Sequence, residues 1–303
     1  MITILRVELR RLITRRLARV VLLLAVIGIA IAGIVNLVRS HDLDPAARDR
    51  LELRDQNIEA CLQGEKRIPR WARGIPEEEM DDFCRYNTGP FVEDPRFHLS
   101  SLVGILEGTS ALWVIAAWLV GASFIGAEWH TGNLATTLTW EPRRIRLFVA
   151  KVAACALGAF VATMLLQALL GLALTPAAVL RGSTENLTGT FWANAIQTAL
   201  RIGGLSAIAA TLGLSVASIG RNTGAALGAG FAYFAVVESG IRALRPGWVE
   251  WLVTENAGIL ITGDPSIFHL GDKNILNAAL VLTAYAFALL AAALILFRKR
   301  DVT

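Results

Sequence analysis

Six long apolar stretches constrain the fold of this chain more than any other feature of its sequence. A helix needs about 20 mostly apolar residues to cross the ~30 Å hydrocarbon core of a bilayer. The stretches are Val20–Val38, Leu99–Gly126, Phe148–Leu174, Phe191–Ile219, Gly224–Val237 and Ile275–Phe297. Only 18% of the 303 residues are charged, whereas soluble domains hold about a quarter. The sequence therefore predicts an all-α polytopic membrane protein with six transmembrane helices in a single domain.

The fifth stretch is short, and an interrupted apolar run follows it. Gly224–Val237 has only 14 residues and ends at Glu238, and the next run, Trp248–Thr262, contains Glu250 and Glu255. Irregular backbone at membrane depth is tolerated only against protein or water. We therefore predict a short span followed by a re-entrant or interfacial segment before the last span.

Basic residues are concentrated at the start of the chain, where six arginines lie between Arg6 and Arg19. Because such residues favour the cytoplasmic side, we expect the N-terminus to be cytoplasmic, and six spans bring the C-terminus to the same side. These residues flank apolar spans, so we expect them to meet anionic lipid headgroups, and no nucleic-acid partner is predicted. A cleavable signal peptide is the alternative for the first span, but no small-residue cleavage site is evident before Arg39.

Residues 40–98 are polar and are predicted to form an extracytoplasmic insertion between the first two spans. They contain Cys61 and Cys84. An oxidising compartment favours a disulfide between these cysteines. Two free thiols, or a metal pair that includes His41 and His98, are the alternatives. No CxxC or HExxH motif occurs, so the sequence predicts no zinc or redox centre.

The stretch between the second and third spans has the most specific pattern. A short helix is predicted over Thr131–Trp140, with Leu134 and Leu138 on one face, and Pro142 ends it. Such a helix is suited to receive force from a cytoplasmic partner. An ordinary loop, with Trp129 and Trp140 as membrane-interface anchors, is the alternative.

This pattern resembles that of the membrane permeases of type-2 ATP-binding-cassette (ABC) exporters. In that class the second span ends in G-x-E-x-x-x-G-[TN]-L, a Pro-Arg turn follows, and a lysine opens the third span. The matching residues here are Gly126, Glu128, Gly132, Asn133, Leu134, Pro142, Arg143, Arg144 and Lys151. We expect the Lys151 side chain to extend back to the headgroup level.

The resemblance implies a permease subunit in a bacterial inner (plasma) membrane, with a second permease copy or a related permease beside it. A separate ABC ATPase subunit on the cytoplasmic face would bind ATP and Mg and hydrolyse the ATP. The resemblance implies that the coupling residues are Glu128, Trp129, Gly132, Leu134, Leu138, Glu141, Pro142, Arg143 and Arg144.

The N-terminal stretch is similar to the interfacial helix of the same class. Leu5, Leu9 and Leu12 share a face with Ile2 and Ile13. Arg16 falls on that apolar face, so we expect a bend there before the first span. A basic tail that only sets orientation is the alternative.

The chain itself has no phosphate-binding loop, because none of its four lysines follows a glycine. It is therefore expected to be no enzyme and to hold no cofactor. The expected cargo is an amphipathic or apolar compound such as a drug, an antibiotic or a lipid-like molecule.

Three ionisable residues lie in the predicted spans: Glu107, Arg201 and Glu238. Such residues are costly in a bilayer, and they either contact cargo along a translocation pathway or form structural ion pairs. An ion-coupled secondary transporter, or a membrane-anchored sensor or immunity protein, is the alternative function. The transporter would need a midplane cluster of acids and an internal repeat, and neither is evident.

Overall fold

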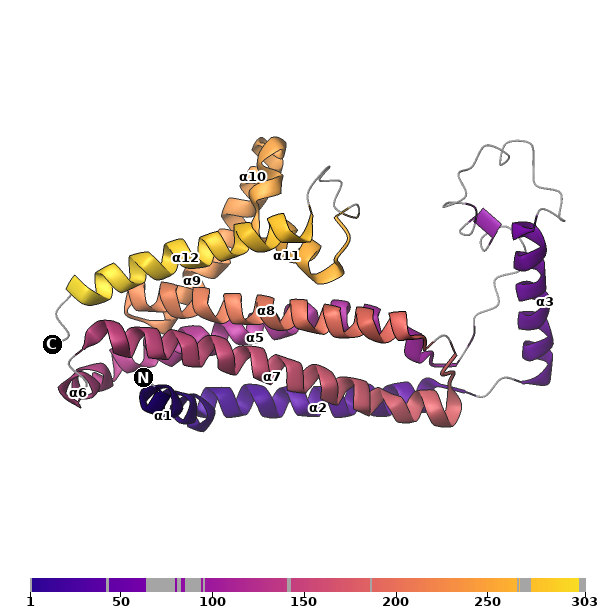
Figure 1. Ribbon diagram of the computed structural model, residues 1–303, viewed down its shortest axis with the longest axis horizontal. Helices are drawn as coiled ribbons and strands as arrows, with labels where there is room; N and C mark the ends of the chain where they lie inside the picture. The colour runs from indigo at the N-terminus through magenta and orange to yellow at the C-terminus, as the bar shows by residue number, and fades with distance from the viewer. Residues whose placement is uncertain are drawn as a thin grey trace. The chain divides into compact units, whose positions relative to one another are not determined.

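The computed structural model describes residues 2–41, 44–63, 80, 83–84, 94, 96–140, 143–185, 187–265, 267 and 274–299. These ranges are mostly helical and contain no β-strand (Figure 1). Their elements are α1 (Ile2–Thr14), α2 (Arg16–Arg39), α3 (Pro45–Leu62), η2 (Leu99–Ser101), α5 (Leu102–His130), α6 (Asn133–Trp140), α7 (Arg144–Arg181), α8 (Gly189–Gly220), α9 (Thr223–Ala232), η3 (Tyr233–Glu238), α10 (Ser239–Leu244), η4 (Pro246–Trp251), α11 (Val253–Thr262) and α12 (Ile275–Lys299). The predicted all-α class is confirmed.

Six helices or helix runs are long and apolar enough to cross a membrane, as predicted. They are Arg16–Arg39, Leu99–His130, Arg144–Arg181, Gly189–Gly220, Thr223–Leu244 and Ile275–Lys299. The chain is thus a multi-pass membrane protein. The fifth run is longer than the sequence suggested, because it continues through the π-helix η3 and so includes Glu238.

The chain divides into two compact units. The first comprises residues 1–31, 100–173 and 186–303, and the second comprises residues 32–99 and 174–185.

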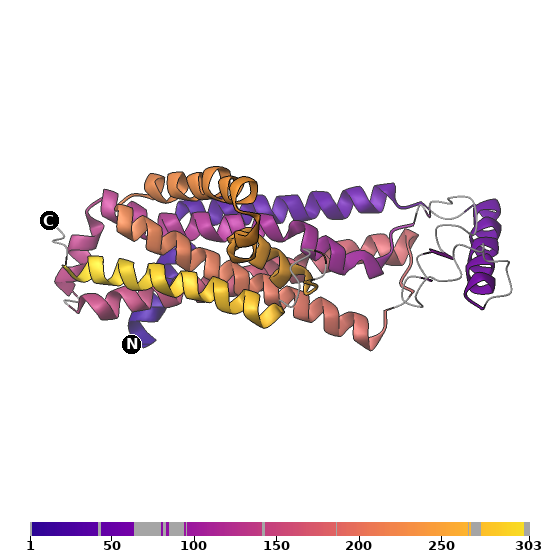
Figure 2. The same cartoon turned by 90° about the horizontal axis from the view of Figure 1, so that it is seen from above.

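The centre of the first unit is the pair of helices α5 and α8, which lie side by side in both views (Figures 1 and 2). A Cβ atom on Gly121 would overlap the Ala210 carbonyl, and one on Gly213 would overlap that of Trp118. Small residues allow this close backbone approach between membrane helices. Helix α12 packs on α8, and α9 packs on both α5 and α8.

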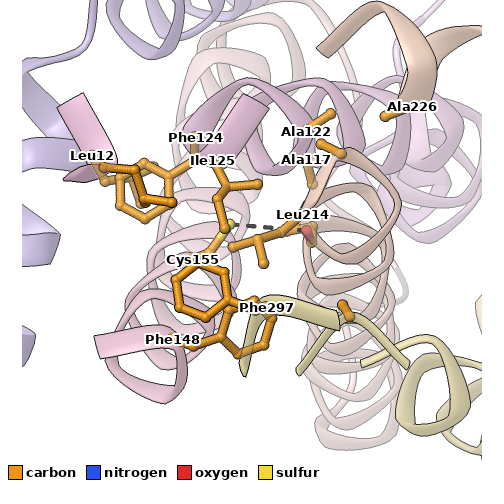
Figure 3. Packing of buried hydrophobic residues seen from close by; sticks show 14 residues of the cluster. Leu12, Ala117, Ala122, Phe124, Ile125, Phe148, Cys155, Leu214, Ala226 and Phe297 are labelled. Carbon is orange, nitrogen blue, oxygen red and sulfur yellow. Dashed lines mark hydrogen bonds between the residues drawn. The ribbon is translucent and has the colours of Figure 1, made fainter. Parts of the chain in front are cut away.

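One apolar cluster brings together α1, α5, α6, α7, α8, α9 and α12 at one end of this unit (Figure 3). It includes Leu12, Leu134, Phe148 and Phe297. As a result α1, α6 and the last turn of α12 lie at the same end (Figures 1 and 2). The expected bend is present as a break at Arg15, which separates α1 from α2.

Two short elements, η4 and α11, stand where the interrupted apolar run was predicted, and α10 precedes them. Leu260 of α11 packs against Leu205 of α8 and Leu282 of α12. This contact fixes α11 to the bundle, and Gly263, with φ 74°, ends the helix in the left-handed conformation that glycine adopts readily.

The second unit contains the predicted disulfide between Cys61 and Cys84. Ile58 of α3 packs against both cysteines, with Met80 and Phe83 beside them. The disulfide rules out the free-thiol and metal alternatives for this pair. Most of the insertion, 64–79 and 85–93 included, lies outside the described residues.

A group of three interacting polar side chains, Asp94, Arg96 and His98, lies elsewhere in the second unit. The Arg96 guanidinium binds the Asp94 carboxylate at 2.7 Å, and His98 Nε2 lies 2.9 Å from the same carboxylate. Burial alone would raise the pKa of Asp94, but the hydrogen bonds and charge of Arg96 lower it below its usual value.

Candidate functional site

Five charged side chains form an alternating chain of ion pairs at the end of the first unit where α1 and α6 lie. Arg11 lies 3.1 Å from Glu8, and the other Glu8 oxygen lies 2.8 Å from Lys151 Nζ. Lys151 Nζ is also 2.8 Å from Glu128 Oε2, and Arg15 binds Glu128 Oε1 at 2.6 Å. We call these five residues the five-charge cluster.

The central charges of this cluster are removed from solvent. The side chains of Lys151, Glu8 and Glu128 are 0%, 1% and 5% exposed. Desolvating a charge costs several kcal/mol, and removing one partner of a buried pair typically destabilises by about 3–5 kcal/mol. Each of these three charges therefore depends on the others, and the cluster holds three separate segments in one arrangement.

Those segments come from distant parts of the sequence. Glu8 and Arg11 are on α1, Glu128 is in the last turn of α5, and Lys151 is near the start of α7. Arg15 lies outside both flanking helices, and its guanidinium also donates to the Ser123 carbonyl at 2.7 Å.

An aromatic ring completes the cluster. Phe124 is fully buried, and the cationic groups of Arg15 and Lys151 lie 4.9 Å and 5.0 Å from its ring centre. Cations within about 6 Å of an aromatic face are attracted to it. Phe124 therefore contributes to the stability of both cations.

The geometry gives a physical reason for the pattern of residues after the second span. Gly126 lets the start of α9 approach, since a Cβ atom there would lie 2.6 Å from the Thr223 backbone nitrogen. Gly132 has φ 69°, a left-handed value that glycine tolerates, and it turns the chain from α5 into α6. Leu134, 1% exposed, then anchors α6 in the apolar cluster.

Trp129 links this end of α5 to two further segments. Its ring lies edge-on to Phe297 of α12, with 6.1 Å between centroids. The Arg221 guanidinium, in the turn between α8 and α9, lies 5.0 Å from the Trp129 ring centre. Arg221 has φ 54°, and within the described ranges it is the one non-glycine residue with a positive φ.

Glu128, Trp129, Gly132 and Leu134 lie together where α5 ends and α6 begins, and their role in coupling stays a prediction. Arg144 is the first residue of α7, and Arg143 directly precedes it. The side chain of Leu138, and the residues Glu141 and Pro142, lie outside what the structure describes. Lys151 was expected to reach the lipid headgroups, but its side chain is fully buried and its ammonium is bound by Glu8 and Glu128 inside the protein.

Sequence reasoning missed Glu8 and Arg15 as site residues. Both looked like ordinary members of the basic N-terminal stretch. The available signal was that Glu8 is the one acidic residue among the first 19, and it falls on the buried face of a helix next to Leu12.

Two of the residues predicted inside the spans do not pair directly. Glu107 interacts electrostatically with Arg201, but no ion pair within 4 Å joins them among the described residues. Arg201 donates to the Thr198 hydroxyl at 2.8 Å and packs over Gly263, where a Cβ atom would collide with it.

Glu238 belongs to a second polar cluster, formed with Arg242, Thr254 and Glu255. Its buried carboxylate accepts hydrogen bonds from the Thr254 hydroxyl and from the Thr254 backbone nitrogen, the latter at 3.1 Å. Arg242 lies 3.6 Å from Glu238 and also binds Glu255. This arrangement fixes the connection between α10 and α11. The pairing of Glu238 with Arg242 therefore fits the structural alternative rather than a contact with cargo.

The described part of the chain contains no group of three or more His, Cys, Asp or Glu residues that could hold a metal ion. Comparisons of the chain with protein-family models, with curated proteins and with solved structures find no match.

Proposed function

We propose that this chain is the transmembrane permease subunit of an ABC transporter of the type-2 class. It would export an amphipathic or apolar compound with energy from ATP that a separate subunit hydrolyses. One observation supports this proposal most strongly: the short helix α6 joins two long apolar helices, and the five-charge cluster fixes their ends to α1.

This geometry is suited to transmit force. Displacement of α6 would act on α5 through the short Gly132 turn and on the apolar core through Leu134. Because Glu128 and Lys151 are ion-paired, the ends of α5 and α7 would move together, and α1 would follow through Glu8. Packed cores and ion-pair networks switch between discrete arrangements rather than deform continuously.

The roles of the site residues follow from their exposure. The Glu128 carboxylate is buried, so it would position the end of α5 and would not touch the ATPase subunit itself. The α6 side chains of Asn133 and Thr136 and the nearby Arg143 are exposed and available to that partner. Leu138, Glu141 and Pro142 remain proposed members of the same surface.

The proposed topology places α6 and both chain ends in the cytoplasm of a bacterial cell, at the inner membrane. The arginine-rich start of the chain supports this orientation. The segment η4–α11 would then be the re-entrant element before the last span, and the insertion 40–98 would lie outside the cytoplasm. A second permease, identical or related, would complete the pathway.

Co-purification and ATP hydrolysis test the proposal. The tagged chain, expressed in its native host, is purified in mild detergent and its partners are identified by mass. We expect an ATPase subunit with a phosphate-binding loop to co-purify, and ATP hydrolysis to respond to amphipathic compounds. Glu128→Gln should reduce that response at least fivefold, whereas the matched control Glu52→Gln, an exposed residue of α3, should leave it unchanged.

Three results would contradict the proposal. Transport by the purified chain alone, driven by an ion gradient, would favour a secondary transporter. A stable complex with a protein that does not hydrolyse nucleotide would favour a sensor or immunity protein. If ATP hydrolysis responded equally to amphipathic compounds in Glu128→Gln and Glu52→Gln, the five-charge cluster would take no part in coupling.

A further inference from the structure

The six arginines near the start of the chain divide into two groups. Arg11 and Arg15 bind carboxylates within the five-charge cluster. The other four are exposed, and none of their side chains forms a hydrogen bond or an ion pair with a described residue. They are Arg6, Arg10, Arg16 and Arg19. The carboxylates near α1 are therefore already engaged, and these four charges need partners from outside the described chain.

These four arginines are interleaved with exposed apolar side chains. Val7 and Ile13 of α1 and Leu17 and Val20 of α2 are all exposed, Ile13 by 62%. A face turned only to water would gain nothing from these apolar groups. Basic and apolar side chains together are typical of helices that lie at the boundary between lipid headgroups and acyl chains.

The local geometry places the four arginines in two pairs. Arg6 and Arg10 are four residues apart on α1, and Arg16 and Arg19 are three apart in the first turn of α2, so each pair shares a face of its helix. The break at Arg15 lies between them, and α2 is a candidate membrane span. Both pairs thus lie next to the point where the chain enters the apolar part of the bilayer.

We propose that Arg6, Arg10, Arg16 and Arg19 form a binding surface for the phosphate headgroups of anionic phospholipids. Guanidinium groups bind phosphate in a bidentate manner, and each basic residue near an anionic leaflet contributes about 1 kcal/mol. The exposed apolar side chains beside them favour lipid over an acidic protein surface as the occupant. Because Glu8 lies on the opposite face of α1 from this surface, bound lipid would hold α1 in the position that the five-charge cluster requires.

The test uses the full-length chain in nanodiscs of phosphatidylcholine with increasing fractions of phosphatidylglycerol. Native mass spectrometry of the chain released from the nanodiscs measures the retained lipid, and thermal unfolding measures stability. We expect the wild type to retain phosphatidylglycerol in preference to phosphatidylcholine, and to melt at higher temperature as its fraction rises. The variant R6Q/R10Q/R16Q/R19Q should lose this preference at least tenfold.

Two matched variants make the test specific. R298Q/K299Q removes two exposed basic residues at the same end of the first unit and should leave the preference unchanged. R6K/R10K/R16K/R19K keeps the positive charge and should retain most of the lipid preference. This variant therefore separates loss of lipid binding from loss of folding.

Three outcomes would overturn the inference: no preference in the wild type, an equal loss in R298Q/K299Q, or loss of a co-purified acidic protein in the glutamine variant while the lipid preference persists. The measurement needs no ATPase partner, so its failure is distinguishable from failure of the proposed function.

Discussion

The two polar clusters of the first unit solve the problem of buried charge in different ways. The five-charge cluster joins residues as far apart in sequence as Glu8 and Lys151, whose side chains are almost fully buried. The cluster around Arg242 joins residues at most 17 positions apart, Glu238 to Glu255, and its arginine is 43% exposed. The first fixes the relative positions of three helices, whereas the second fixes one local turn. Their energetic consequences should differ accordingly.

The largest effect is expected from Lys151→Met. The change leaves Glu8 and Glu128 buried without their shared cation, at a cost of about 3–5 kcal/mol. Thermal unfolding of the purified chain in detergent measures the loss. Glu8→Gln/Glu128→Gln/Lys151→Met should recover part of it, because the buried carboxylate charges are then also gone; a triple variant less stable than the single one would contradict this explanation.

A smaller loss is expected from Gly126→Ala, which tests the packing beside the five-charge cluster. The new methyl group would overlap Thr223, whose backbone nitrogen would lie only 2.6 Å from it, and overpacking of this kind costs about 1–3 kcal/mol. Gly104→Ala is the matched control in the same helix, since nothing lies within 4 Å of a Cβ atom there. Equal melting temperatures for the two variants would show that α9 does not approach α5 as closely as described.

Arg242→Gln should cost about 1 kcal/mol or less, because the guanidinium is half exposed and exposed ion pairs contribute little. Glu238 keeps its hydrogen bonds from Thr254 in this variant. The same thermal-unfolding assay compares the loss of stability in this variant with the loss in Lys151→Met. Should the two losses be similar, the contrast between the two clusters would be wrong.

The smallest effect is expected from Arg221→Gly. The change removes the contact with Trp129, worth about 0.5–1 kcal/mol, but relieves a left-handed backbone by a similar amount. Arg221→Ala loses the contact without relieving the backbone, so it should melt below the glycine variant. The reverse order would show that the left-handed conformation is absent in solution.

Features determined by local sequence were predicted well. The apolar stretches and the short helix before Pro142 follow from periodicity and composition, and the structure has the short helix as α6 with a small shift of its start. The Cys61–Cys84 disulfide followed from the expected compartment and is present.

Features that depend on packing between distant helices were not predicted. Nothing local to Lys151 indicates that Glu8, far away in sequence, binds it, and so its ammonium was expected at the membrane surface. The π-helix Tyr233–Glu238 was likewise missed, since its residues have no distinctive pattern. The family resemblance pointed to Glu128, but its burial and its partners came only from the structure.

Site-specific cross-linking from α6 tests most directly the proposal that a partner ATPase drives this bundle through that helix. A photoreactive amino acid replaces either Thr136, which is exposed on α6, or Thr190. Thr190 is exposed in the first turn of α8, at the end of that helix away from α6 (Figure 1). We expect an ATP-hydrolysing subunit to be cross-linked from position 136 in cells and not from position 190. Cross-linking from 190 alone, or from 136 only to extracytoplasmic proteins, would contradict it.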